Sequence, residues 1–362
     1  MHLQSTRNEH RRFQLLFLFA NLLFLAPAIA QQPATGKSAP LPPPFETIKN
    51  SKEFNAVRLG PGNTFSIVET PPDFRLSEFA ISGDGRLLAM GFGSGRIELW
   101  DLHTKKRIHE LRSEIGAPGV LKFNAQADQL VVTGSGGKIV FLELPKGKKL
   151  REFAIPLGKY KYDVHELALD RNGKWLAYAD EESSNVVDMS SDPPKPIVDL
   201  KDAYSVALSQ DGTELWTVNR SELMAFHTAN WELIGHWPLK SPPMGTSRPL
   251  VRTGVTPDGR RTVVVPSTQG LVIYTEPEMS GDYVTNKQTN TVAFAPPTHT
   301  YVNLAGEITL LNGEGHLLCK KSYKGRVSEA LSEDGQWLAL SQFNSVDLWR
   351  MEDLLCDCET GR

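Results

Sequence analysis

The sequence has few cysteines, and none of them precedes position 319. The three are Cys319, Cys356 and Cys358, and no Cys or His pair with zinc spacing accompanies them. The HExxH motif of zinc proteases and the GxSxG motif of serine hydrolases are also absent, and the histidines are scattered. The sequence therefore predicts no catalytic residues, no metal and no cofactor.

The odd number of cysteines leaves their chemistry open. Cys319 ends a predicted outer strand and Cys356 follows the last predicted strand, so in an oxidising compartment a disulfide between them would fasten the end of the chain. Free thiols, or a metal or redox role for Cys356 and Cys358, are the alternatives. The disulfide is the pairing that we expect.

An excess of positive charge is lacking as well. The chain of 362 residues has a formal net charge of −3, with 39 Lys and Arg against 42 Asp and Glu. Residues 1–30 contain three arginines and one glutamate, a charge of +2, so the chain without them carries −5. A mildly acidic chain is not typical of a nucleic-acid-binding protein.

One apolar run stands near the start of the chain. Basic residues around Arg11 precede an apolar stretch from Leu15 to Ala28, and the small residues Ala28 and Ala30 follow. This order is typical of a secretory signal peptide over residues 1–30. The alternative is an uncleaved anchor, but the run is shorter than the roughly 20 residues that span a bilayer, and Pro27 interrupts it.

The sequence therefore predicts an exported protein, periplasmic or extracellular, with no membrane span after cleavage. Residues 31–53 form the expected linker, because residues 31–45 are rich in proline and are not expected to pair in a sheet. Residues 54–362 form the expected folded domain.

A strand and turn frame organises that domain. Residues 81–102, ISGDGRLLAMGFGSGRIELWDL, indicate three strands joined by an Asp-Gly turn and a Gly-Ser-Gly turn. The frame begins at Ile81 and returns at Leu169, Leu208, Val255 and Leu331, with weaker copies at Phe123 and Phe294. Between these seven positions the steps are 42, 46, 39, 47, 39 and 37 residues.

A period near 40 residues with several strands per unit indicates a β-propeller. The expected fold is all-β: seven blades, each with four antiparallel strands. The ring must close or leave an exposed edge, so we expect the N-terminal strand at residues 65–70 to complete the last blade.

The pair Trp100-Asp101 and the turn frames resemble the WD40 repeat family over residues 65–350, as an exported and bacterial member. We expect a monomer that serves as an interaction scaffold. Ser94 and Asn344 stand where that family has an Asp, so we expect packing rather than a polar network to hold the blades. Five tryptophans are the expected fillers between blades: Trp100, Trp175, Trp216, Trp337 and Trp349.

Loops on a rigid propeller vary freely, which favours a non-catalytic binding scaffold. The alternative is a propeller enzyme, lactonase-like or quinoprotein-like, with a site at the central channel. On one rim of the ring we expect basic and tyrosine residues to contact a protein partner or an anionic envelope polymer. These are Lys159, Tyr160, Lys161, Tyr162, Arg220, Arg248, Tyr323, Lys324 and Arg326.

Overall fold

The computed structural model divides the chain into two compact units, Met1–Lys37 and Ser38–Arg362. The described residues all belong to the second unit. They are 39–40, 46–49, 55–59, 65–69, 76–134, 137–155, 164–180, 183–209, 211–241, 251–255, 260–267, 269–285, 292–295, 300–304, 307–311, 317–322, 329–332, 335–342 and 345–353. The expected signal peptide lies outside them and stays a prediction.

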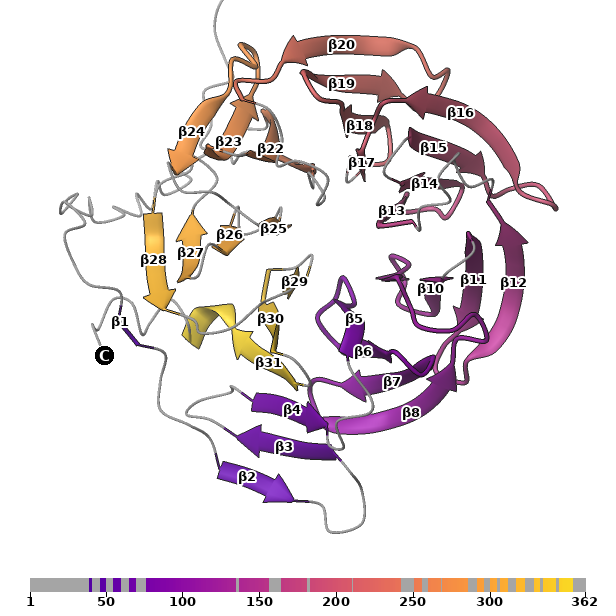
Figure 1. Ribbon diagram of the computed structural model, residues 1–362, viewed down its shortest axis with the longest axis vertical. Coiled ribbons are helices and arrows are strands. Elements are labelled where there is room, and N and C mark those ends of the chain that lie inside the picture. Colours follow the sequence, from indigo (N-terminus) through magenta and orange to yellow (C-terminus); the bar gives the residue numbers. More distant parts are fainter. Residues whose placement is uncertain are drawn as a thin grey trace, which may run out of the picture. The chain divides into compact units, whose positions relative to one another are not determined.

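Five antiparallel sheets of four consecutive strands, and the four antiparallel strands of a sixth sheet that also holds β1, form six blades (Figure 1). Within each blade the chain runs from the innermost strand to the strand at the perimeter. Blades one to three comprise β5 (Leu76–Ile81), β6 (Leu87–Phe92), β7 (Arg96–Asp101), β8 (Lys106–Arg112), β9 (Val120–Phe123), β10 (Gln129–Gly134), β11 (Lys138–Glu143), β12 (Lys148–Ala154), β13 (Glu166–Leu169), β14 (Trp175–Ala179), β15 (Ser183–Asp188) and β16 (Lys195–Lys201). Blades four to six comprise β17 (Ser205–Leu208), β18 (Glu214–Val218), β19 (Glu222–His227), β20 (Leu233–Pro238), β21 (Arg252–Val255), β22 (Arg261–Ser267), β23 (Gly270–Thr275), β24 (Asp282–Thr285), β25 (Val292–Ala295), β26 (Thr300–Leu304), β27 (Glu307–Leu311) and β28 (Leu317–Ser322).

A composite sheet closes the ring between blades six and one. Its order is β2-β3-β4-β31-β30-β29, so three strands come from each end of the second unit. Its inner strand β29 lies against β25 and β5. The six strands are β2 (Glu46–Lys49), β3 (Asn55–Leu59), β4 (Phe65–Glu69), β29 (Glu329–Leu331), β30 (Trp337–Gln342) and β31 (Ser345–Arg350).

The expectation of seven four-stranded blades is therefore wrong: the structure has six such blades and this six-stranded closing sheet. The frame at Leu331 was counted as a blade, but it supplies only three strands before residues 351–353 turn into a helix. The strand expected at residues 65–70 lies beside β31, with Phe65 opposite Leu348. The sequence did not predict β2 and β3, which extend the sheet outward.

The proline-rich segment also departs from expectation. Ala39 and Pro40 form the short strand β1 (Ala39–Pro40), parallel to β28 and opposite Lys321 and Ser322. Residues 31–45 were expected not to pair because proline has no N–H to donate. At the outer edge of a sheet only one side of a strand bonds, and proline is tolerated there.

The frame recurs along the chain because its residues make the same turn contacts in different blades. In blade one the Ser82 hydroxyl donates to Asp84 (2.6 Å) and accepts from the Leu87 N–H (2.8 Å). In blade four Ser209 makes the same two contacts, with Asp211 and the Glu214 N–H. Gly85 closes the first of these turns at φ 66°, a conformation that favours glycine. The Ser, the Asp and the Gly of the frame thus each have a structural role.

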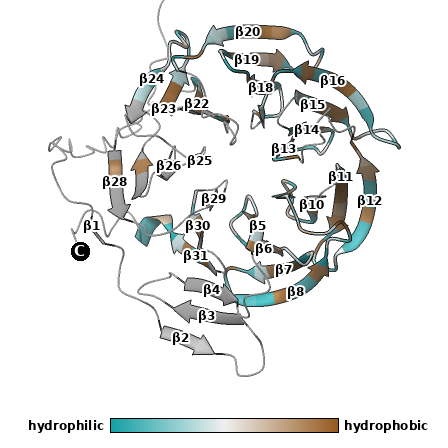
Figure 2. Cartoon of the chain, viewed as in Figure 1, coloured by the Kyte–Doolittle hydropathy of each residue, from teal (hydrophilic) through white to brown (hydrophobic). Residues whose placement is uncertain are grey.

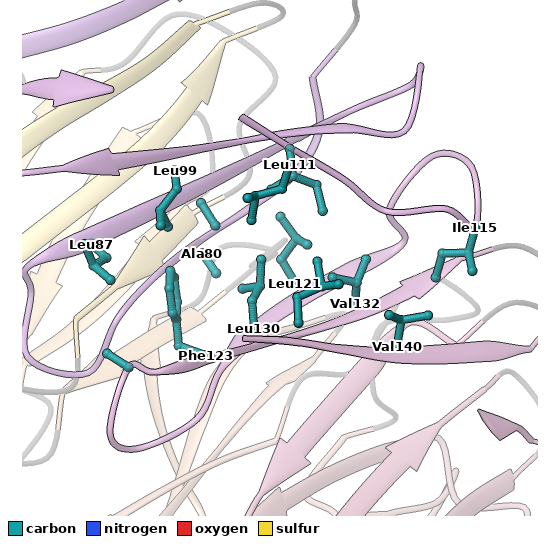
Figure 3. Close-up of a cluster of buried hydrophobic side chains, with 14 residues drawn as sticks. Ala80, Leu87, Leu99, Leu111, Ile115, Leu121, Phe123, Leu130, Val132 and Val140 are labelled. Atoms are coloured by element: carbon teal, nitrogen blue, oxygen red, sulfur yellow. The ribbon is translucent and has the colours of Figure 1, made fainter. Parts of the chain in front are cut away.

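Aliphatic side chains fill the space between neighbouring blades. Between blades one and two, Leu99 and Leu111 face Leu121, Leu130 and other residues of one buried cluster (Figure 3). Clusters of the same kind lie between blades two and three, three and four, and four and five. Packing therefore joins these blades, as the sequence predicted.

Four of the five expected tryptophans are buried: Trp100, Trp216, Trp337 and Trp349. Trp175 is only partly buried and meets Trp231 edge-to-face at 5.0 Å between ring centroids.

Two of these indoles belong to buried polar pairs that the sequence analysis missed. Trp100 Nε1 donates to Glu98 (2.9 Å), and Trp216 Nε1 donates to Glu214 (3.1 Å). Glu98 has no exposed surface, and Arg96 and Arg107 both pair with its Oε1. Buried polar pairs therefore act in these blades beside the packing that the sequence analysis emphasised.

Candidate functional site

The two ends of the ring carry different turns. We call upper rim the end that holds the segments leading into each first strand and the turns between second and third strands. The lower rim holds the turns between first and second strands and between third and fourth strands. This division follows from the antiparallel order of each blade. All the expected contact residues were assigned to the upper rim.

A buried carboxylate joins two blades at this rim. Glu166, the first residue of β13, accepts from the Ser205 hydroxyl (2.5 Å) and from the Val206 N–H (2.9 Å) at the start of β17. The Glu166 side chain is 6% exposed, and Ser205 has no exposed surface. These bonds satisfy two donors that would otherwise be buried without a partner.

The same network reaches a third blade. Arg252, the first residue of β21, places Nη1 2.7 Å from Glu166 Oε1, and the Ser205 hydroxyl accepts from the Val251 N–H at 2.8 Å. Arg252 is 33% exposed, so solvent reaches one partner of the ion pair. Blades three, four and five are therefore connected at the upper rim. We call Glu166, Ser205 and Arg252 the rim lock.

The rim lock holds three blades together through the Ser205 hydroxyl and the Glu166 carboxylate. The Ser205 proton points to a carboxylate that Arg252 already neutralises, and its oxygen accepts a backbone N–H. The Ser205 hydroxyl thus donates to blade three and accepts from the segment that leads into blade five.

More exposed groups surround the lock. His165 Nε2 lies 2.9 Å from the Tyr204 carbonyl oxygen, which ties the two segments that lead into β13 and β17. The Arg220 guanidinium lies over the Tyr204 ring, 5.9 Å from its centroid. Asn219 fixes the turn that carries Arg220, because its side-chain oxygen accepts from the Ser221 and Glu222 N–H groups (2.8 and 2.7 Å).

Arg220 is the one expected contact residue among the described residues, and it is exposed. The others lie outside them: Lys159, Tyr160, Lys161, Tyr162, Arg248, Tyr323, Lys324 and Arg326. Cys319 lies on β28 opposite Leu310, whereas Cys356 is outside the described residues, so the disulfide stays a prediction.

The sequence contains a sign of the rim lock that the sequence analysis missed. Glu166, Ser205 and Arg252 each stand three residues before the apolar residue of a frame, at Leu169, Leu208 and Val255. Residues at one position of successive repeats lie at one height in neighbouring blades. A Glu, a Ser and an Arg at the same position of three successive repeats therefore predict that their side chains contact one another.

Burial raises the pKa of one tyrosine hydroxyl near this rim. Tyr178 on β14 is 2% exposed, and burial raises the pKa of its hydroxyl, with the negative charges of Asp180 and Asp199 adding to the effect. The side chain is therefore neutral throughout the physiological range.

Within the described part of the chain, no three or more His, Cys, Asp and Glu side chains gather as metal ligands would. None of the helices described there has the length and apolarity to cross a membrane.

Comparison with known proteins supports the fold. No family model matches the sequence, and no curated protein matches it. Among solved structures, the Cps50 (Swd1) β-propeller domain of Myceliophteria thermophila is similar, with a TM-score of 0.62 and 17% identity over 76% of this chain and 96% of that one. Kuenenia stuttgartiensis hydrazine synthase is similar with a TM-score of 0.59 and 15% identity over 77% of this chain and 96% of that one. At these identities the likeness shows a β-propeller and no more, so membership of the WD40 family stays a prediction.

Proposed function

We propose that this protein is an exported, non-catalytic propeller that binds a protein partner at its upper rim. The observation that carries the proposal is the rim lock, which occupies the buried polar groups of three blades with one another. A rigid base of this kind supports loops that carry the residues for binding.

Described residues at or beside the lock follow, in the sequence, two of the segments expected to contact the partner. Residues 159–162 precede Val164 and His165, and Arg248 precedes Val251, whose N–H bonds to Ser205. Arg220 and Tyr204 add an exposed guanidinium and a ring at the same rim. Tyr and Arg are enriched among residues that dominate binding energy.

Affinity capture from the native envelope extract tests the proposal. The wild type is compared with Arg220→Glu and with Arg171→Glu, which reverses an exposed arginine on the lower rim. We expect Arg220→Glu to recover several-fold less of one defined protein, and Arg171→Glu to recover as much as the wild type.

Equal recovery by both variants would show that the upper rim is not the binding face. Capture of a polysaccharide instead of a protein would contradict the proposal of a protein partner and would identify an anionic polymer as the ligand. Turnover of a lactone or of a quinone-linked substrate by the purified protein would favour the enzyme alternative.

A further inference from the structure

The perimeter of the ring has a repeated irregularity. In each of the six blades, the pairing of the third strand with the outer strand shifts by one residue, which leaves one outer-strand residue without an opposite partner. The residue at this bulge is aliphatic every time: Ile108, Leu150, Ile197, Ile234, Val284 and Leu318.

On two adjacent outer strands the bulge residue is exposed among basic residues. Ile108 on β8 is 39% exposed, and Leu150 on β12 is 46% exposed. Lys106 stands two residues before Ile108, and Lys148 two residues before Leu150, and both lysines are exposed. Ile108 and Leu150 therefore place exposed apolar surface directly beside exposed lysines.

The charge of these strands is opposite to that of the chain. In β8, Lys106, Arg107 and Arg112 against Glu110 give a formal charge of +2, and in β12, Lys148, Lys149 and Arg151 against Glu152 also give +2. By the same count β16 carries +1, β20 carries zero and β24 carries −1. β28 holds two lysines, but β1 pairs along its outer edge.

The two strands form one continuous surface. Lys149 Nζ lies 3.1 Å from Glu114 Oε2, just beyond the end of β8. At the start of β12, a Cβ on Gly147 would lie 2.5 Å from Leu111 Cδ2, so the backbone of the turn touches β8. In Figure 2 both strands are mostly coloured as hydrophilic, and each also contains hydrophobic residues. Among the described residues no further strand pairs with the outer edge of either.

We propose that the outer surface of β8 and β12, centred on Ile108 and Leu150, docks on a bilayer that contains anionic lipids. The basic side chains meet the headgroups, and their long aliphatic stems let the two bulge residues reach the acyl boundary. A soluble anionic polymer would use the charges but would leave Ile108 and Leu150 in water, whereas a bilayer meets both the charges and the apolar side chains, which is why we favour a lipid surface.

Vesicle flotation of the full chain tests this inference, with phosphatidylglycerol and phosphatidylcholine mixtures against pure phosphatidylcholine. The charge variant carries Lys106→Glu and Lys148→Glu, and the apolar variant carries Ile108→Ser and Leu150→Ser. The matched control carries Lys195→Glu and Ile197→Ser on β16, which has the same kind of bulge with Ile197 37% exposed. The apolar run near the start of the chain is common to all variants and cancels in the comparison.

We expect the partition coefficient on anionic vesicles to fall at least about tenfold for the charge variant, since each basic residue near an anionic surface contributes roughly fivefold and the variant removes two. The apolar variant is expected to lose about three- to tenfold, and the control to match the wild type. Circular dichroism and melting temperature confirm that each variant is folded.

Three results would overturn the inference. One is equal partitioning of the control and both variants. Another is wild-type binding that does not depend on lipid charge, or no binding at all. The third is binding to soluble dextran sulfate that competes with vesicles and is unchanged in the apolar variant, which would identify an anionic polymer as the ligand.

Discussion

Replacement of Glu166 by Ala removes the centre of the rim lock. The Glu166 carboxylate accepts three bonds, from Ser205, Val206 and Arg252. A buried donor left without its acceptor costs about 1–3 kcal/mol, and both the Ser205 hydroxyl and the Val206 N–H lose their acceptor. Arg252 is 33% exposed and regains water, which lowers the total. We therefore expect Glu166→Ala to reduce the free energy of unfolding by about 3–5 kcal/mol.

Urea unfolding followed by tryptophan fluorescence measures this loss, with the melting temperature as a second readout. Glu166→Gln keeps the shape and part of the bonding, so its loss should be smaller. The matched control is Glu222→Ala, whose side chain is 38% exposed beside His236 and which should cost no more than about 1 kcal/mol. A loss below about 1 kcal/mol for Glu166→Ala would refute the claim that the lock joins the three blades.

Three further substitutions test the packing and the electrostatics. Trp100→Ala should cost about 3–5 kcal/mol in urea unfolding, because the indole is 4% exposed and bonds to Glu98, and a loss below 1 kcal/mol would contradict its burial. Gly147→Ala should lower the melting temperature more than Gly116→Ala. Both glycines have positive φ, but a Cβ at Gly147 would meet Leu111, whereas a Cβ at Gly116 would meet nothing. Equal shifts in melting temperature would contradict the close contact at Gly147. Because burial raises the pKa of Tyr178 above its unfolded value of about 10, the unfolded chain releases this proton first and stability falls as pH rises above about 10. Urea unfolding between pH 8 and 11 should show a shallower fall for Tyr178→Phe, and identical slopes would count against the buried phenol.

The repeat made the architecture predictable. The Ser-x-Asp-Gly turn has its own chemistry, so its spacing predicted the strands of blade after blade, and alternation predicted the buried faces. The closing sheet was not predictable in the same way. β2 and β3 belong to no repeat, and their pairing depends on contact with β4 and β31, far along the chain.

The polar contacts between blades escaped the sequence analysis for a related reason. Glu166 and Arg252 are 86 residues apart, and neither is unusual in its own strand. Only alignment of the repeats places them at one height. The bulge residues were equally hidden, because a register shift is a property of two paired strands and not of either sequence alone.

The central claim is that a partner binds at the upper rim, and crosslinking from a single position tests it directly. A photoreactive amino acid replaces Arg220 on the upper rim or, as the control, Arg171 on the lower rim, and the protein is irradiated in the native envelope. The account predicts a specific protein adduct from position 220 and none from position 171. Adducts of equal yield from both positions, or from position 171 alone, would contradict it.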